Sequence, residues 1–364
     1  MAIHDDILKF QHKVDMRSTA LADEMVKELR ASRTTIVGKL AALADDAGAA
    51  FDDLPLSRRK ALLEAQAAAI DDVLTGVYSS ASDSLKDAGE DVIGATLTNT
   101  AELMATITGG AALGVGAGLS RDITALWFES STVEGLTINN FLEKIQASAR
   151  DRIISAGRRG LIEGASVQRT AQMIRVEGIE GSVPGLEGLA RTFLHSASSY
   201  ARDTITREKF ADTVSGWRRS VVLDGRTCVA CGSMDGKTYG LNEPKPTLPA
   251  HWRCRCLYLP IPITWRDLGI GMDEADEGDR TTVKHSSRTV HHRDGSTSTK
   301  FTVQEVGSVP SGTSYEMWLR RQLDEDPDFV KSILGKTRFD LFKSGKLRLS
   351  SMVTEGRIKN LSEL

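Results

Sequence analysis

Residues 223–231 read LDGRTCVAC and residues 249–256 read PAHWRCRC, and these two stretches give the strongest structural signal in the chain. All four cysteines lie in them, and a histidine lies in the second. A Cys-x2-Cys pair places two thiolates one tight turn apart, and zinc binds four nitrogen or sulfur ligands in a tetrahedron. The sequence offers five candidate ligands for four places: Cys228, Cys231, His251, Cys254 and Cys256.

The surplus of ligands favours a closed structural site, because a catalytic zinc keeps one position open for water. A zinc deaminase would carry a glutamate two residues after its histidine, where this chain has Arg253. A disulfide or free-thiol arrangement and a redox site are the weaker alternatives, since the cysteines are clustered and the Cys-x2-Cys pair lacks a βαβ context. If residues 254–256 are extended, Cys254 and Cys256 point to the same face, so the choice between them stays open.

Composition and charge favour a helical protein without a general affinity for nucleic acid. The 364 residues are 40% hydrophobic and only 5% aromatic, and many apolar positions are alanine, which suits closely packed helices. The net charge of −3 provides no overall attraction to DNA or RNA. Residues 1–6 lack the basic and apolar regions of a signal peptide, so we expect synthesis and folding in a reducing cytoplasm.

The predicted fold class is α+β, mainly α, with five segments. Residues 1–135 are expected to form an Ala-rich helical region and residues 136–216 a part built on a helical hairpin. Residues 217–263 should form a small β-containing module held together by structural Zn²⁺, which contributes about 10 kcal/mol or more to its folding. Residues 264–300 are predicted to be a polar linker or a long flexible hairpin, and residues 301–364 a mixed α/β C-terminal piece.

Local signals place several elements within these segments. Helical periodicity covers residues 6–48 and 83–107, and Thr132–Thr137 is expected to be a loop. Gly164 suits a helix C-terminus and Ser166 the next N-cap, so residues 138–176 should form a helix-turn-helix. Residues 178–188 are rich in glycine and proline and are predicted to be a loop, followed by a helix over 189–216. Strands are expected over 218–223 and 256–263.

Two segments allow a functional as well as a structural interpretation. The helical hairpin carries four arginines that could face DNA phosphates, although a solvated basic face of an ordinary hairpin is the simpler interpretation: Arg158, Arg159, Arg169 and Arg175. Residues 103–120 lack charge and have small residues at four-residue spacing, a pattern that can pack membrane helices. Strong apolar residues are few there, so we expect a buried glycine-rich contact, with a membrane-active segment as the weaker alternative.

The two cysteine stretches, together with Met234-Asp235-Gly236-Lys237 and the hairpin sequence GLIEGAS at residues 160–166, resemble the Mu F-like phage head-morphogenesis family of minor head proteins. The resemblance covers roughly residues 140–262. It implies a structural, non-enzymatic minor capsid protein of a tailed bacteriophage, located at the portal vertex or capsid interior after assembly in the host cytoplasm. The implied partners are the portal protein, major capsid or scaffold proteins and further copies of the chain, with possible contact to phage DNA during packaging or ejection.

The C-terminal piece raises an alternative function. Residues 315–319, 334–338 and 345–347 are similar to tails of some Mu F-like proteins that are grouped with small toxin nucleases. A metal-free ribonuclease needs a general base and a cation for the phosphate, and the candidates are His285, His291, His292, Arg293 and Arg338. Their polar surroundings favour a linker and a docking segment instead. A nuclease effector delivered with the genome and a membrane-active ejection protein remain the alternative functions.

Overall fold

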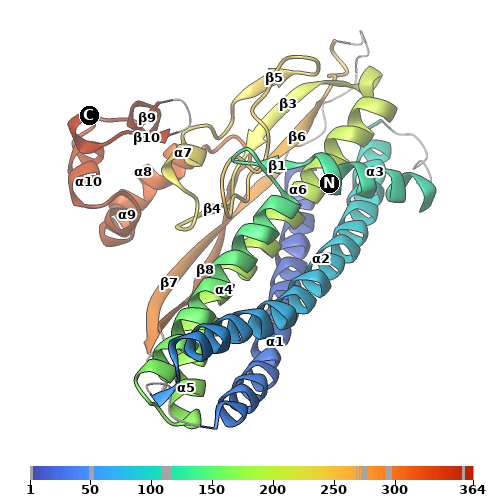
Figure 1. Cartoon of the computed structure of the whole chain (residues 1–364). Coiled ribbons are helices and arrows are strands. Elements are labelled where there is room, and N and C mark those ends of the chain that lie inside the picture. Colours follow the sequence, from blue (N-terminus) through green and yellow to red (C-terminus); the bar gives the residue numbers. More distant parts are fainter. Residues whose placement is uncertain are drawn as a thin grey trace.

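The structure, a computed structural model, describes residues 3–48, 53–108, 117–267, 269, 271, 278–291, 297–354 and 357–363. Helices predominate, and the strands form small antiparallel and mixed sheets (Figure 1). The predicted α+β, mainly α class is therefore confirmed.

Long helices form a bundle that makes up most of the molecule. They are α1 (Ile3–Ala47), α2 (Leu56–Thr108), α3 (Ala117–Ser130), α4 (Ile138–Ile162) and α6 (Val183–Lys209). At a rise of 1.5 Å per residue, the 45 residues of α1 extend over about 68 Å and the 53 residues of α2 over about 80 Å. Apolar side chains at helical spacing, such as Leu21, Met25 and Leu29 of α1, are almost fully buried in the common core.

The helical hairpin has the predicted turn chemistry. Gly164 follows α4 with a φ of +61°, a left-handed conformation that glycine adopts without a steric cost. The Ser166 hydroxyl accepts a hydrogen bond from the Arg169 backbone N–H at 3.2 Å and caps α5 (Val167–Met173). These two residues fix the turn that the sequence predicts.

The predicted loop over residues 178–188 is wrong. The chain continues through a π-helical segment (Ile174–Ile179) and a 3₁₀ turn (Glu180–Ser182) into α6. Pro184 lies in the first turn of α6, where a proline removes no helical hydrogen bond. The glycines serve close packing: a Cβ on Gly178 would lie 2.5 Å from Ile153, and one on Gly188 would lie 2.4 Å from the Trp252 ring.

The predicted helix over 189–216 extends too far, because its last residues belong to a strand. Helix α6 ends at Lys209, and residues 214–216 already belong to β3 (Val214–Ser220). Gly216 pairs with Gly240, and a Cβ on Gly216 would lie 2.2 Å from the Tyr239 carbonyl oxygen. Gly216 therefore permits a close strand pairing and does not terminate a helix.

Two three-stranded sheets cover one side of the bundle. The antiparallel sheet has the order β5-β3-β6, and the mixed sheet has the order β4-β7-β8 with β4 parallel to β7. The strands are β4 (Leu223–Asp224), β5 (Thr238–Gly240), β6 (Leu257–Pro262), β7 (Asp279–His291) and β8 (Thr297–Pro310). Strand β7 occupies the second half of the segment predicted as a linker or a long hairpin, so the hairpin alternative applies there. Strand β8 crosses the expected boundary at residue 301. The expected loop at 132–137 is a minimal hairpin of β1 (Thr132–Val133) and β2 (Leu136–Thr137).

The C-terminal residues form a small, mainly helical unit. It contains α8 (Tyr315–Glu325), α9 (Pro327–Leu334), α10 (Lys336–Lys343), a 3₁₀ turn (Leu349–Met352) and the short pair β9 (Val353–Thr354) and β10 (Arg357–Ile358). Ser314 caps α8 by accepting from the Met317 N–H. Tyr315, Trp318 and Phe342 are fully or almost fully buried in its core.

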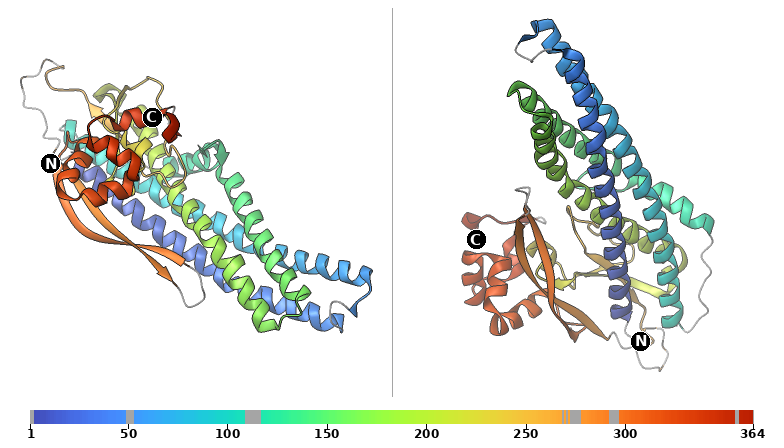
Figure 2. Two further views of the ribbon diagram at one scale, coloured as in Figure 1. Left: turned by 90° about the vertical axis from the view of Figure 1, so that its left-hand side faces the viewer. Right: turned by 90° about the horizontal axis from the view of Figure 1, so that it is seen from below.

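The molecule is elongated, and different elements lie at its two ends. The end of α1 and the start of α2 lie with α5 at one end, while β3, β6 and the C-terminal unit lie toward the other (Figures 1 and 2). The β7–β8 hairpin runs beside α1. Ile7, Leu103, Leu257 and Leu259 form a further apolar cluster that joins the bundle to β6.

Candidate metal centre

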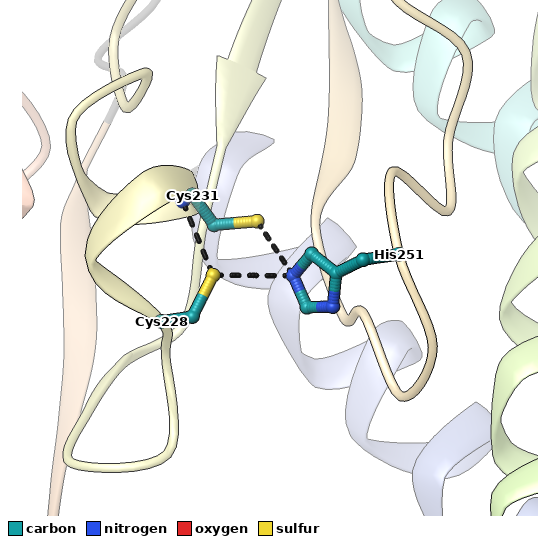
Figure 3. Close-up of side chains that lie close together, drawn as sticks. All are labelled: Cys228, Cys231 and His251. Atoms are coloured by element: carbon teal, nitrogen blue, oxygen red, sulfur yellow. Dashed lines mark hydrogen bonds between the residues drawn. The ribbon is translucent and has the colours of Figure 1, made fainter. Parts of the chain in front are cut away.

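The first pair of ligands is presented by a single helical turn. Helix α7 (Val229–Gly232) begins directly after Cys228, whose Sγ accepts a hydrogen bond from the Cys231 backbone N–H at 3.3 Å. Cys228 therefore acts as the N-cap of α7 and points its sulfur toward the same side as Cys231 (Figure 3). This is the local geometry that the Cys-x2-Cys spacing predicts.

The second group of ligands comes from the irregular segment before β6. The Cys254 N–H donates to the His251 carbonyl oxygen at 3.0 Å and closes a tight turn. Arg253 adopts a left-handed φ of +64° within this turn. Its backbone N–H donates to the Thr192 hydroxyl, and its guanidinium donates to the Pro184 carbonyl oxygen, so the turn is attached to α6. The residue that argued against a deaminase thus has a structural role.

The cysteine and histidine side chains form two overlapping groups whose spacings are close to those of a tetrahedral metal site. The His251 Nε2 lies 3.1 Å from the Cys228 sulfur and 3.2 Å from the Cys231 sulfur (Figure 3), and the Cys231 and Cys254 sulfurs are 3.8 Å apart. Zinc bond lengths give a sulfur–sulfur edge of about 3.8 Å and a sulfur–nitrogen edge of about 3.6 Å. Two groups of side chains within 4.8 Å, one of Cys228, Cys231 and His251 and one of Cys231, Cys254 and Cys256, could therefore hold a metal ion. Cys231 belongs to both groups.

The histidine is held in the tautomer that a metal needs. The Trp252 carbonyl oxygen lies 2.8 Å from Nδ1 of His251, and a carbonyl can only accept a hydrogen bond. In the neutral ring, Nδ1 therefore carries the proton and the lone pair of Nε2 faces the sulfurs. Most metal-binding histidines donate their other ring N–H to a neighbouring acceptor, and here the acceptor is the Trp252 carbonyl oxygen.

The thiols strongly affect each other's ionisation. A hydrogen bond from Cys231, with His251 nearby, lowers the pKa of Cys228 to about 4, and a hydrogen bond from Cys231 also lowers the pKa of Cys254. The pKa of Cys231 is raised because its proton is shared with these neighbours. Several thiolates in one buried site would repel each other. A bound divalent cation would neutralise their charge and allow all of the ligands to ionise.

Cys254 and Cys256 have different surroundings. A hydrogen bond with Cys231 lowers the pKa of Cys254, and the His251 ring lies nearby. For Cys256, a hydrogen bond with Cys231 favours the thiolate, but the neighbouring Cys254 and burial raise the pKa, and Arg219 provides its nearby positive charge. Arg219 is 3% exposed and also donates to the Cys231 sulfur at 3.5 Å. These contacts favour Cys254 as the fourth ligand and place Cys256 beside the arginine.

Two buried ion pairs hold the cysteine turns in place. Both carboxylate oxygens of Asp224 accept from Arg255, at 2.7 and 2.8 Å, while Asp224 also accepts from the Thr227 N–H just before Cys228. Asp235 and Arg280 form a second two-fold pair at 2.8 and 3.1 Å. Sequence reasoning missed both pairs. Asp224 and Arg255 are charged residues inside the motif and could have been suspected, but Arg280 lies in the predicted linker.

The metal centre shares its core with the C-terminal unit and does not form a separate module. Cys231, Cys254 and Cys256 are buried in one apolar cluster with Tyr315, Trp318 and the other apolar side chains of α8–α10. The Tyr315 hydroxyl lies 3.1 Å from the Asp224 carbonyl oxygen, and its backbone N–H donates to Asp235. A Cβ on Gly232 would lie 2.4 Å from the Tyr315 ring. The predicted boundary at residue 263 therefore does not separate two cores.

The bundle contacts the centre through an aromatic residue beside His251. The Trp252 ring stacks on Phe141 of α4 with centroids 4.7 Å apart. It also lies against Gly188 of α6, where only a glycine leaves enough space. The metal centre thus lies where the bundle, the sheets and the C-terminal unit meet.

The four predicted DNA-binding arginines and Arg338, whose side chains the structure describes, do not converge on a site. Arg159 forms an ion pair with Glu177, Arg175 donates to Gln172, and Arg158 and Arg169 are exposed. Arg338 donates to the Lys359 carbonyl oxygen, which is a structural contact. His292 and Arg293 lie outside the described residues, as do the side chains of His285 and His291. Within the described part of the chain, no helix has the length and hydropathy needed to cross a bilayer, and residues 109–116 of the uncharged segment lie outside that part.

In comparisons with known proteins, no family model, no curated protein and no solved structure matches this chain.

Proposed function

We propose that this chain is a structural minor head protein of a tailed bacteriophage, with one structural Zn²⁺ bound by Cys228, Cys231, His251 and Cys254. The residues around the metal centre carry the resemblance to the Mu F-like head-morphogenesis family. In this proposal the chain acts in head assembly through contacts with the portal, capsid or scaffold proteins and with copies of itself. It resides in the particle, at the portal vertex or capsid interior.

The observation that carries the proposal is the closed nature of the metal centre. The cavity bordered by all five candidate ligands, Cys228, Cys231, His251, Cys254 and Cys256, has a volume of about 10 Å³, which suits an ion and leaves no room for a substrate. Protein side chains can fill all four positions of a tetrahedral ion, so no position remains for a reactive water. A metal held in this way joins parts of the chain, which supports a structural role for the centre.

The architecture supports an assembly role. Helices of about 68 and 80 Å provide a long surface for neighbouring subunits, while the buried pairs Asp224–Arg255 and Asp235–Arg280 stiffen the end that carries the metal. The exposed Arg158 and Arg169 are available for DNA phosphates if the chain contacts the genome.

Mass spectrometry of purified particles tests this function. The chain should be found in mature particles and in scaffold-stage heads from the host that encodes it, in constant ratio to the portal protein. The major capsid protein from the same sample serves as the control for recovery. If the portal and capsid proteins are recovered and this chain is missing from both preparations, the proposal is wrong.

A further inference from the structure

A second polar cavity lies on the other side of α6 from the bundle core. It has a volume of about 260 Å³ and is bordered by the end of α3, by α6, by β3 and β6, and by the segment 245–248 that leads toward His251. It does not include any of the metal ligands.

Arg202 of α6 lines this cavity with an unsatisfied buried charge. The residue is 2% exposed, and its Nη2 has no hydrogen-bond partner among the described residues. Burial lowers the pKa of Arg202 to about 10, so the guanidinium is still charged at neutral pH. An unpaired buried charge costs several kcal/mol, and proteins rarely retain one without a compensating group.

A second donor in the same wall is also unpaired. Trp217 of β3 is fully buried, and its indole N–H has no acceptor within the described part of the chain. Ser199 and Thr247 add hydroxyl groups to the lining. The cavity is therefore lined by a buried cationic side chain and by hydroxyl groups, which suits a ligand with acceptor oxygens.

The charge balance around the cavity is positive. Asp203 lies at its edge and forms ion pairs with both Lys245 and Arg207. The Lys245 ammonium also lies 4.6 Å from the centre of the Trp217 ring. Within the lining, one carboxylate thus faces two cations, Lys245 and Arg202, which attracts an anion into the cavity.

We propose that this cavity binds a small molecule with a carboxylate or phosphate group, whose oxygens accept hydrogen bonds from the guanidinium of Arg202. The volume of about 260 Å³ is at the lower end of small-molecule sites and limits the ligand to a small organic acid or phosphate. Such a ligand joins α6 to the segment 245–248 and stiffens the junction between the bundle and the sheets. This inference is independent of the proposed particle role.

Isothermal titration calorimetry with inorganic phosphate and, separately, with succinate tests the proposal at constant ionic strength, with sodium chloride as the balancing salt. The full-length protein should bind at least one of them, and the stronger ligand identifies the source of the anionic group. Arg202→Met should weaken binding about ten- to a hundred-fold, because a hydrogen bond to a charged group is lost. Arg30→Met, which removes an exposed arginine of α1, is the matched control and should bind like the unaltered protein.

The stability of the ligand-free protein separates this role from a structural one. Without anion, Arg202→Met should unfold at the same temperature as the unaltered protein or higher, since it removes an unpaired buried charge. If Arg202→Met does not fold, Ser199→Met retains the arginine and fills the cavity from its half-buried wall, and this variant should lose anion binding. Failure of both anions to bind at concentrations on the order of 10 mM overturns the proposal, as does unchanged binding by either variant.

Discussion

Cys254 and Cys256 are two residues apart and chemically identical, yet the fold gives them different neighbours. Cys254 lies 3.8 Å from the Cys231 sulfur and near the ring of His251, whereas Cys256 faces Arg219. The sequence could predict the five candidates because ligand chemistry is local to the residue. It could not choose between the last two, since Arg219 approaches them from a strand far along the chain.

We therefore predict different effects for the two cysteines. Loss of a group that only contacts a ligand typically weakens metal binding about 10- to 100-fold. Cys254→Ser should weaken zinc binding by more than this, because it removes a ligand. Cys256→Ser should still bind one full equivalent of zinc. Competition with a chromogenic chelator under reducing conditions measures both affinities. The reverse order would assign the fourth position to Cys256.

A second residue-scale feature joins two helices and predicts a pH dependence. His195 of α6 is 2% exposed and its Nε2 lies 2.8 Å from the Asp15 carboxylate of α1, while its Nδ1 contacts Gln11. Burial raises the pKa of Asp15, but the hydrogen bond and charge of His195 outweigh it and lower the pKa to about 2.

Because the pKa of Asp15 is lower in the folded state, its ionised form stabilises the fold above pH 4 and loses that effect as the pH falls toward 2. Asp15→Asn should lower the free energy of unfolding by up to about 2 kcal/mol at pH 7 and by about 1 kcal/mol at pH 3. Urea unfolding followed by helical circular dichroism measures this difference. Asp91→Asn, at an exposed aspartate of α2, is the control, and its effect on the free energy of unfolding should not depend on pH in this way. If Asp15→Asn loses the same free energy at pH 7 and at pH 3, the lowered pKa of Asp15 is contradicted.

At the scale of elements, glycine explains both the success and the failure of the sequence predictions. Gly164 was correctly predicted to end α4, because its left-handed φ is a local property. Gly178, Gly185 and Gly188 suggested a loop, but they lie in helical segments and permit close packing. Such a role depends on a distant partner, so local composition cannot reveal it.

Gly188→Ala tests the contact between α6 and the metal-centre loop. The new methyl group would overlap the Trp252 ring, so we expect a loss of about 1–3 kcal/mol in the free energy of unfolding. Gly157→Ala is the matched control, since its Cβ would lie 3.5 Å from Leu40 in an ordinary contact, and it should be neutral or stabilising by about 0.5–1 kcal/mol. Chemical unfolding measures the free energy of unfolding of both variants. Equal changes for Gly188→Ala and Gly157→Ala would contradict the packing role of Gly188.

At the scale of the whole molecule, the metal centre connects parts that the sequence suggested were separate. The sequence could predict the helices and the candidate ligands from periodicity and spacing. The shared core of Cys231 and Tyr315 could not be predicted, because the contact spans a polar segment and the Tyr315–Asp224 pair alone is 91 residues apart. Burial of charged partners such as Asp235 and Arg280 likewise depends on the completed fold.

This connection predicts which parts loosen together when the metal is lost. Cys228→Ser should increase amide hydrogen exchange both in residues 217–263 and in residues 315–353, while α1 and α2 keep their protection. Hydrogen exchange read by mass spectrometry resolves these regions. Loosening confined to 217–263, with an unchanged C-terminal unit, would show that the two parts fold independently.

We propose that the Cys228–Cys231 turn and the His251–Cys254 turn together hold a single zinc ion. Elemental analysis of the full-length protein, purified under reducing conditions, tests this most directly. We predict about one zinc per chain. Protein that is fully reduced and folded but contains no bound metal would contradict the account.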